Sequence, residues 1–242
     1  MHIIKLSATD STNDYLKQMH KEKNLKNYTV VTTLLQAQGK GQMGTKWFSE
    51  TGKNLTFSIL VKNIAVNNNS IFDYNVAVSV SILEILQANN IPHLSIKWPN
   101  DIMAENKKVG GILIENNVKA DGIIDSIIGI GLNVNQENFD SLPQATSLKN
   151  SVQITFDLDN LLIKIVSQIQ ENLNFISTKK ETFWSTYSKN LFKMNTPIAL
   201  ENQHNQRFMG VIKGVTKEGK LTVILEDDSF QYYGVKDVKM LY

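Results

Sequence analysis

The sequence predicts an α+β fold, with a mixed β-sheet covered by helices on one face and a small β-barrel at the C-terminus. Short β-branched or apolar segments recur up to residue 134, and only a few helical segments interrupt them. From Thr196 onward the pattern changes to five short alternating segments with four glycines at their bends (Gly210, Gly214, Gly219 and Gly234). We therefore expect a first domain over residues 1–194 and a second over residues 195–242.

The elements of the first domain follow from periodicity and from turn signals. We expect strands over 2–7, 29–36, 54–62, 94–97, 101–105, 108–116 and 122–134, a long loop over 37–53, and helices over about 12–23, 71–88, 157–175 and 180–192. Ser11 is a candidate cap for the first helix. The segment 71–88 is apolar nearly all round, which predicts a helix buried against the sheet. Asn106-Lys107 marks a tight turn between two strands.

The composition is ordinary for a globular protein. Hydrophobic residues make up 42% of the 242 residues, and the formal net charge is only +2, which does not describe a dedicated nucleic-acid binder. The chain has no cysteine, no signal peptide pattern and no apolar run long enough to cross a bilayer. Its four histidines are far apart, so a histidine metal site or a Ser-His-Asp triad is not expected. We expect a cytoplasmic protein that binds neither DNA nor a membrane.

The first chemical motif is the glycine-rich loop that contains Gly39-Lys40-Gly41-Gln42-Met43-Gly44. It matches the G-x-G-x-x-G spacing of dinucleotide-binding turns, but no helix pattern follows the glycines, so that interpretation is rejected. Exposed backbone N–H groups of such a loop can still bind an anion, and Lys40 adds a positive charge. A solvated hairpin loop explains the same residues equally well.

Two further motifs lie at breaks in the predicted strands. Pro99 in Lys97-Trp98-Pro99-Asn100-Asp101 cannot donate to a sheet ladder, so this segment is either a fixed break that points side chains at a ligand or a simple turn. The adjacent Gly110 and Gly111, just after Lys108, indicate close approach of a ligand or of another backbone, or else a β-bulge. Another pair of small residues and a polar amide, Gly129 to Asn133, ends the next strand.

These segments, taken in order, resemble the biotin–protein ligase family. The matching set is Ser11-Thr12-Asn13, Gln36 with the Gly39–Trp47 loop, Lys97–Asp101, Lys108–Gly111 and Gly129–Asn133. Each piece is weak alone, but five in this order are specific, and they span about residues 1–190. The resemblance implies a class II synthetase-like catalytic domain and an SH3-like C-terminal barrel. Because the chain begins at the catalytic strand, it resembles the ligase-only type without a DNA-binding domain.

The resemblance also implies roles for individual residues. Biotin would lie near Ser11, Thr12, Asn13, Gln36, Gly39, Lys40, Gly41, Gly110 and Gly111, with its carboxylate on Lys108. Trp47 would stack on adenine, and Lys97, Asn100, Gly131 and Asn133 would contact the nucleotide. Asp101 would hold or orient Mg²⁺, and Lys108, Lys40 and Asp101 would be the catalytic residues.

The implied reaction uses ATP and Mg²⁺ to form biotinyl-5′-AMP and then transfers biotin to a lysine of a biotin carboxyl carrier domain. A homodimer is possible. A lipoate or octanoyl ligase on the same fold, or a non-enzymatic biotinyl-AMP-binding module, are the alternatives. One departure concerns the glycine loop, which has Gln42, Met43 and Thr45 where arginine is common in the family. We hypothesise that the adenylate is held less tightly, or that other cations compensate.

Overall fold

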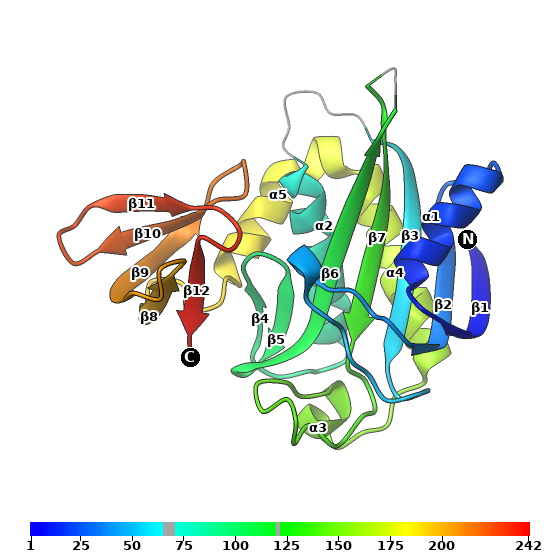
Figure 1. Ribbon diagram of the computed structural model, residues 1–242, viewed down its shortest axis with the longest axis horizontal. Coiled ribbons are helices and arrows are strands. Elements are labelled where there is room, and N and C mark those ends of the chain that lie inside the picture. The colour runs from blue at the N-terminus through cyan, green and yellow to red at the C-terminus, as the bar shows by residue number, and fades with distance from the viewer. Residues whose placement is uncertain (65–70, 120–121) are drawn as a thin grey trace.

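The computed structural model describes residues 1–64, 71–119 and 122–242 and contains two separate β-sheets (Figure 1). The larger sheet has seven strands in the order β1-β2-β3-β7-β6-β5-β4, and only β1 and β2 pair in parallel. Its strands are β1 (His2–Thr9), β2 (Thr29–Gln36), β3 (Leu55–Ile64), β4 (Leu94–Lys97), β5 (Asp101–Ala104), β6 (Lys107–Val118) and β7 (Ile124–Leu132). The predicted mixed sheet is therefore confirmed, and the bounds of β2 and β4 coincide with the prediction.

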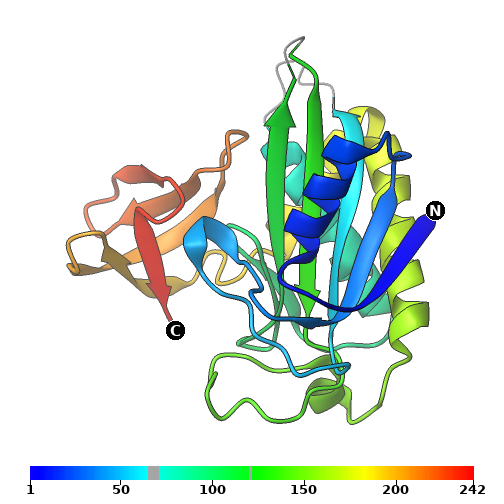
Figure 2. The same cartoon turned by 45° about the vertical axis from the view of Figure 1, so that its right-hand side comes forward.

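Helices cover both faces of this sheet, whereas the sequence predicted a cover on one face only. The main core lies between the sheet and three helices, α2 (Phe72–Ala88), α4 (Leu158–Asn174) and α5 (Ile176–Lys189). Helix α1 (Thr12–Glu22) lies on the opposite face, where its Leu16 packs with Val31, Leu60 and Ile127 (Figure 2). Leu16 is the one apolar residue of this short helix that is fully buried. One such residue does not tell from the sequence against which face of the sheet the helix packs.

Strands β1, β3, β5, β6 and β7 differ from their predicted bounds by one or two residues at an end, and the larger differences lie elsewhere. A short helix, α3 (Leu148–Val152), was missed, although Ser147 caps it by accepting a hydrogen bond from Asn150 N. Helix α5 begins directly after α4, because Phe175 both ends one helix and begins the next. The turn before β6 is centred on Glu105 and Asn106 rather than on Asn106-Lys107, and Glu105 has a positive φ of 57°.

The second sheet is antiparallel and lies at one end of the molecule (Figure 1). Its strands are β8 (Pro197–Asn202), β9 (Arg207–Val215), β10 (Leu221–Leu225), β11 (Phe230–Tyr233) and β12 (Val238–Leu241), in the order β11-β10-β9-β8-β12. Gly219 and Gly234 lie outside strands as predicted, but Gly210 and Gly214 lie inside β9. Gly210 is needed there because a Cβ atom would meet Val223 of the neighbouring strand β10 at 2.5 Å.

Among the described residues, no helix is both long and apolar enough to cross a membrane.

Candidate active site

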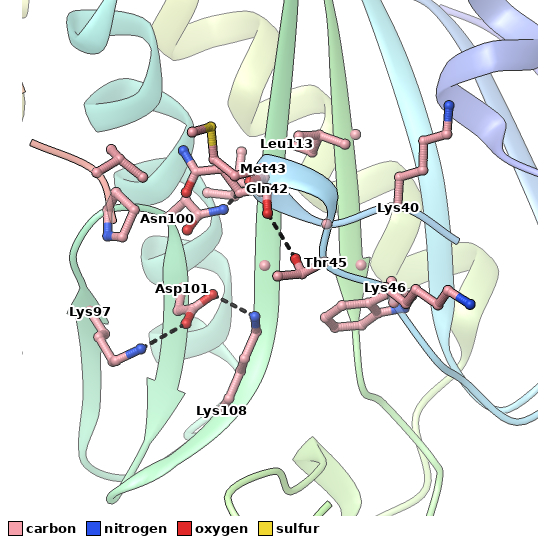
Figure 3. A pocket seen from close by; sticks show the side chains of 18 of the residues that line it. Lys40, Gln42, Met43, Thr45, Lys46, Lys97, Asn100, Asp101, Lys108 and Leu113 are labelled. Atoms are coloured by element: carbon pink, nitrogen blue, oxygen red, sulfur yellow. Dashed lines mark hydrogen bonds and ion pairs between the residues drawn. The ribbon is translucent and has the colours of Figure 1, made fainter. Parts of the chain in front are cut away.

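A cavity of about 570 Å³ opens on the face of the large sheet that also carries α1. Ile127 packs under α1, and Gly129 and Gly131 follow it at alternate positions of β7, so all three face the same side. The other walls come from the first turn of α1, the glycine-rich loop, the Lys97–Asp101 segment and the C-terminal strand β12 (Figure 3). Strand β6 contributes Lys108 and Gly111 as well, so six segments that are distant in sequence meet in one cavity.

One end of the cavity is formed by neutral side chains, and we call Ser11, Thr12, Asn13 and Gln36 the amide–hydroxyl end. Ser11 caps α1 by accepting a hydrogen bond from Asp14 N. Gln36 is the last residue of β2, and its Oε1 accepts from both Thr12 N (2.8 Å) and Thr12 Oγ1 (3.0 Å). The cap and the strand end therefore hold each other in place.

Asn13 extends this end into the wall behind the cavity. Its Nδ2 donates to Glu115 Oε2 at 2.7 Å, and its Oδ1 accepts from Ser58 Oγ at 2.6 Å. Gly129 leaves the space for this amide, because a Cβ atom at position 129 would collide with Asn13 Oδ1. The sequence predicted a close approach or a β-bulge at Gly110-Gly111 of the neighbouring strand, and the pairing of β5 with β6 shifts register there, between Ile102 and Met103, which confirms the bulge.

The glycine-rich loop folds back on itself beside the cavity. Gly41 N donates to Thr45 O at 2.7 Å and Trp47 N donates to Gly39 O at 2.9 Å, which closes a short turn over Gln42–Gly44. Lys40 Nζ lies 2.6 Å from Asp14 Oδ2, and this hydrogen bond raises the pKa of Lys40 above its usual range. The loop contains one short 3₁₀ helix, Gln42–Gly44, and no α-helix follows the glycines, as predicted.

The second sheet supplies cations to this loop that the sequence did not predict. Lys236 Nζ donates to Met43 O at 2.7 Å, and both Lys236 and Lys239 line the cavity. Lys236 therefore contacts the loop at Met43, one of the positions where arginine is common, which favours the hypothesis that other cations compensate.

Trp47 lies against the glycines of the two central strands. A Cβ atom at Gly131 would collide with the indole ring, and one at Gly111 would lie 3.5 Å from it. Lys108 Nζ lies over the ring, 5.6 Å from its centroid. The indole Nε1 is buried and has no hydrogen-bond partner among the described residues. Such a donor is costly to leave unpaired, so it marks a position where a bound molecule would be stabilised.

The other end of the cavity is charged, and we call Lys97, Asp101 and Lys108 the lysine–aspartate cluster. Asp101 lies between the two lysines, with Oδ2 3.1 Å from Lys97 Nζ and Oδ1 2.6 Å from Lys108 Nζ (Figure 3). All three side chains are partly buried, so water screens the charges less than at a free surface. The cluster can therefore attract an anionic group strongly.

The strand break that carries Asp101 is held from three directions. The Trp98–Pro99 peptide bond is cis, and Asn75 of α2 donates to Pro99 O at 2.7 Å. Trp98 Nε1 donates to Gly219 O of the second sheet at 2.9 Å. Asn100 Nδ2 donates to Ile112 O, and Ile112 N donates back to Asn100 O. The segment is thus the turn of the antiparallel β4–β5 hairpin and also a fixed break beside the cavity, so both interpretations of its sequence hold.

A metal site made by the protein alone is not found in the part of the chain that the structure describes, where no three His, Cys, Asp or Glu side chains gather. Asp101 is the carboxylate in the charged cluster, and a lysine is paired with each of its oxygens. Mg²⁺ is commonly bound by one or two carboxylates together with substrate phosphates. The residues therefore fit a metal ion that arrives with a triphosphate, with Asp101 as a single protein ligand.

The cavity collects most of the residues that the sequence singled out, but not all of them. Its lining includes Ser11, Thr12, Asn13, Gln36, Lys40, Gly41, Trp47, Lys97, Asn100, Asp101, Lys108, Gly111 and Gly131. Gly39, Gly110 and Asn133 are not among the lining residues. Asn133 is 4% exposed and donates to Thr146 O, and its expected contact with the adenylate stays a prediction. Its role here is to hold the segment that follows β7.

Sequence reasoning missed the contribution of the C-terminal residues. Val235, Lys236, Val238, Lys239, Met240 and Tyr242 all line the cavity. Lys97 Nζ lies over the ring of Tyr242, 5.4 Å from its centroid. No local pattern signals these contacts, because only the packing of the second sheet against the first brings them to the site.

The mixed sheet, its glycine-rich loop and the lysine-bearing strand break define a protein of the synthetase-like protein-ligase class. The chain belongs to the biotin/lipoate A/B protein ligase family, whose family model matches residues 6–135. The bifunctional ligase/repressor BirA of Escherichia coli is 26% identical over 226 residues, which cover 92% of this chain and 68% of BirA. The biotin–[acetyl-CoA-carboxylase] ligase of Mycobacterium tuberculosis is 22% identical over 77% of this chain and 69% of its own length.

A solved structure supports the same assignment of fold. The biotin protein ligase of Aquifex aeolicus, in complex with biotin and ATP, superposes with a TM-score of 0.82 at 27% identity. The superposition covers 99% of this chain and 98% of the other. Both sheets of this chain therefore belong to the shared architecture.

Proposed function

We propose that the chain is an ATP-dependent biotin–protein ligase. In the first step the biotin carboxylate attacks the α-phosphorus of ATP, pyrophosphate leaves and biotinyl-5′-AMP forms. In the second step the amine of an acceptor lysine attacks the acyl carbon, AMP leaves and the amine loses a proton. The observation that carries this proposal is a single cavity with a neutral hydrogen-bonding end and a lysine-rich end. These two ends suit the urea ring and the anionic groups, respectively.

The first step brings a carboxylate to a triphosphate, and like charges oppose that approach. Lys108, Lys97 and Lys40 line the cavity and can screen this repulsion and the charge that develops in the transition state. We assign Lys108 to the biotin carboxylate and Lys97 with Asn100 to the nucleotide. Each lysine is paired with a carboxylate in the ligand-free protein, so the anionic substrates would exchange with Asp101 and Asp14 as partners.

Mg²⁺ would reduce the negative charge of the triphosphate when bound, and Asp101 is its proposed protein ligand. Trp47 offers a flat face for adenine, and stacking on an aromatic ring contributes about 1–3 kcal/mol per base in single-stranded nucleic acids. The glycine-rich loop, with Gly39, Lys40 and Gly41, would close over the adenylate and keep water from this reactive mixed anhydride.

The acceptor is proposed to be the carrier domain of a biotin-dependent carboxylase, and the reaction is proposed to take place in the cytoplasm. The relatives named as biotin–[acetyl-CoA-carboxylase] ligases support this choice. The matched family also includes lipoate ligases, so a lipoate or octanoyl substrate is the second candidate. A non-enzymatic module that only holds biotinyl-AMP is the third.

The test is incubation of the purified protein with biotin, MgATP and a biotin carboxyl carrier domain. We expect the acceptor to gain the mass of one biotinyl group and pyrophosphate to be released, and an acceptor with its target lysine changed to arginine should gain nothing. Pyrophosphate without labelling would indicate that the acceptor is wrong or that the protein only makes and holds the adenylate. Activity with lipoate or octanoate but not with biotin would contradict the proposal.

A further inference from the structure

Tyr242 places an aromatic ring beside the lysine–aspartate cluster. It lies just after β12 of the second sheet and lines the cavity, and Lys97 Nζ lies over its ring, 5.4 Å from the centroid. The same ring packs in a T-shaped arrangement against Phe192, with the centroids 5.0 Å apart. Its carbonyl oxygen accepts a hydrogen bond from Gln144 Nε2 at 3.3 Å. Phe192 and Gln144 both lie outside the second sheet, so the first domain holds Tyr242 beside Lys97.

Lys97 has Asp101 as a charged partner, but it shares that carboxylate with Lys108. Lys97 Nζ lies 3.1 Å from Asp101 Oδ2, whereas Lys108 Nζ lies 2.6 Å from Asp101 Oδ1 (Figure 3). In the function proposed above, Asp101 exchanges its lysine partners for Mg²⁺ when the substrates bind. The side chain of Lys97 is only 19% exposed, so a cation left there without a partner would be costly. Lys97 therefore needs a second contact that persists while Asp101 changes its partner.

The ring of Tyr242 suits this task because it attracts a cation without neutralising it. The face of an aromatic ring carries partial negative charge and attracts an ammonium group within about 6 Å of its centroid. The ring has no net charge, so, unlike a carboxylate, it leaves the charge of Lys97 available to a phosphate group. A lysine that already rests on a ring also loses less rotamer freedom when the nucleotide binds.

We propose that Tyr242 is a positioning residue that holds Lys97 in place for the nucleotide after Asp101 has released it. The inference rests on the proposed function, because that function assigns Lys97 to the nucleotide. The urea ring of biotin is assigned to the other end of the cavity, so Tyr242 should act on ATP and not on biotin. The second domain then contributes to ATP activation through an uncharged ring as well as through its lysines.

The test is a double-mutant cycle between Tyr242→Leu and Lys97→Met, with pyrophosphate release measured at saturating biotin. We expect Tyr242→Leu to lower kcat/KM for MgATP about fivefold, as for the loss of a partly buried cation–π contact. In the Lys97→Met background the same change should have no further effect. Tyr242→Phe keeps the ring and should stay within about twofold of the parent. The affinity for biotin, measured by calorimetry, should be the same in the parent and in both Tyr242 variants.

A second series separates the electrostatics of the ring from its packing. A phenylalanine at position 242 can carry increasing numbers of fluorine atoms, which withdraw electrons from the ring face but change its shape little. We expect kcat/KM for MgATP to fall stepwise with each added fluorine. Tyr232→Leu is the matched control, because it makes the same side-chain change at an exposed position of β11 in the same sheet. It should leave kcat/KM at the parent value.

The outcomes distinguish this inference from the proposed function. If every fluorinated ring matches Tyr242→Phe, or if Tyr242→Leu costs as much in the Lys97→Met background as in the parent, Tyr242 only packs against its neighbours and the inference is wrong. A parallel loss of biotin affinity would also overturn it, because that loss would show a general effect on the fold. If the unaltered protein releases no pyrophosphate with biotin and MgATP, the proposed function itself is wrong.

Discussion

The two ends of the cavity are built in opposite ways. The amide–hydroxyl end consists of neutral groups that satisfy one another, and Ser11, Thr12 and Asn13 are each only 3% exposed. In the lysine–aspartate cluster the charges satisfy one another, and the side chain of Lys108 is 34% exposed. The hydrogen-bonding groups of the first end are already arranged to receive a urea ring. In the second end the lysines are paired with Asp101.

This difference follows from the cost of burying each kind of group. Neutral donors and acceptors can be held in a fixed pattern without a ligand, because each finds a partner in the wall. Lys97 and Lys108 at the charged end would repel each other, and Asp101 between them offsets that repulsion. Asp101 and Asp14 act as internal counterions that substrate anions would replace. Binding at the charged end should therefore require rearrangement, and binding at the neutral end should not.

The largest effect is expected from removing the cation assigned to the biotin carboxylate. Lys108→Ala should lower kcat/KM for pyrophosphate release about 10²- to 10³-fold, as for the loss of one electrostatic contact to a developing charge. Lys107→Ala, at the exposed neighbouring position, is the control and should stay near the parent value. Retention of more than about a tenth of the parent activity by Lys108→Ala would contradict the role assigned to Lys108.

Two glycines on one strand allow each end to be disturbed separately. A methyl group at Gly129 would collide with Asn13, and one at Gly131 would collide with Trp47. Overpacking of this kind costs about 1–3 kcal/mol, which is about tenfold or more in affinity. We expect Gly129→Ala to raise the KM for biotin and Gly131→Ala to raise the KM for ATP. Each variant controls for the other, and equal effects on both substrates would argue against two distinct ends.

The loop cations should have a smaller effect, on retention of the intermediate. Lys236→Ala removes the hydrogen bond to Met43 O and should speed release of biotinyl-adenylate about threefold in the absence of acceptor. Met43→Arg should slow that release. The control is Lys213→Ala, an exposed lysine of β9 that bonds to Asn195. If Lys236→Ala and Met43→Arg both release adenylate at the parent rate, the compensation hypothesis is wrong.

Salt should distinguish the two ends without any mutation. Raising the salt concentration from about 0.05 to 0.5 M shortens the distance over which charges act, so the KM for MgATP should rise a few-fold. Neutral hydrogen bonds are not screened in this way, and biotin, with a single charge, should lose much less affinity. Titrations at several salt concentrations measure both, and equal slopes for the two ligands would contradict the comparison.

The parts of this arrangement that depend on local sequence were predictable. The strand at 29–36 follows from its β-branched residues, and the adjacent glycines Gly110-Gly111 predicted a close approach or a bulge, where the structure has a register shift and Trp47 beside Gly111. The contacts of Lys236 had no such signal, because its partner Met43 lies 193 residues away. Glu115 likewise looks like an ordinary strand residue until Asn13, 102 residues earlier, is placed beside it. Both contacts depend on long-range packing, which the spacing of residues in the sequence does not reveal.

Asn133 shows that the position of a residue in the sequence does not determine the direction of its side chain. The sequence placed it inside a strand expected to reach residue 134, whereas β7 ends at Leu132, and the direction of its side chain depends on Thr146, whose carbonyl oxygen accepts its amide proton. The same residue type at Asn100 and Asn13 lines the cavity. A polar amide near a strand end is therefore a candidate, and its hydrogen-bond partner decides which way it faces.

The most direct test of the two-ended cavity is a crystal structure of this protein with biotin and ATP bound. We predict the urea ring between Thr12 and Gln36, with the biotin carboxylate on Lys108 and the ion pair between Lys108 and Asp101 opened. A biotin ring placed against the lysine–aspartate cluster, or an intact ion pair of Lys108 with both substrates bound, would contradict the account.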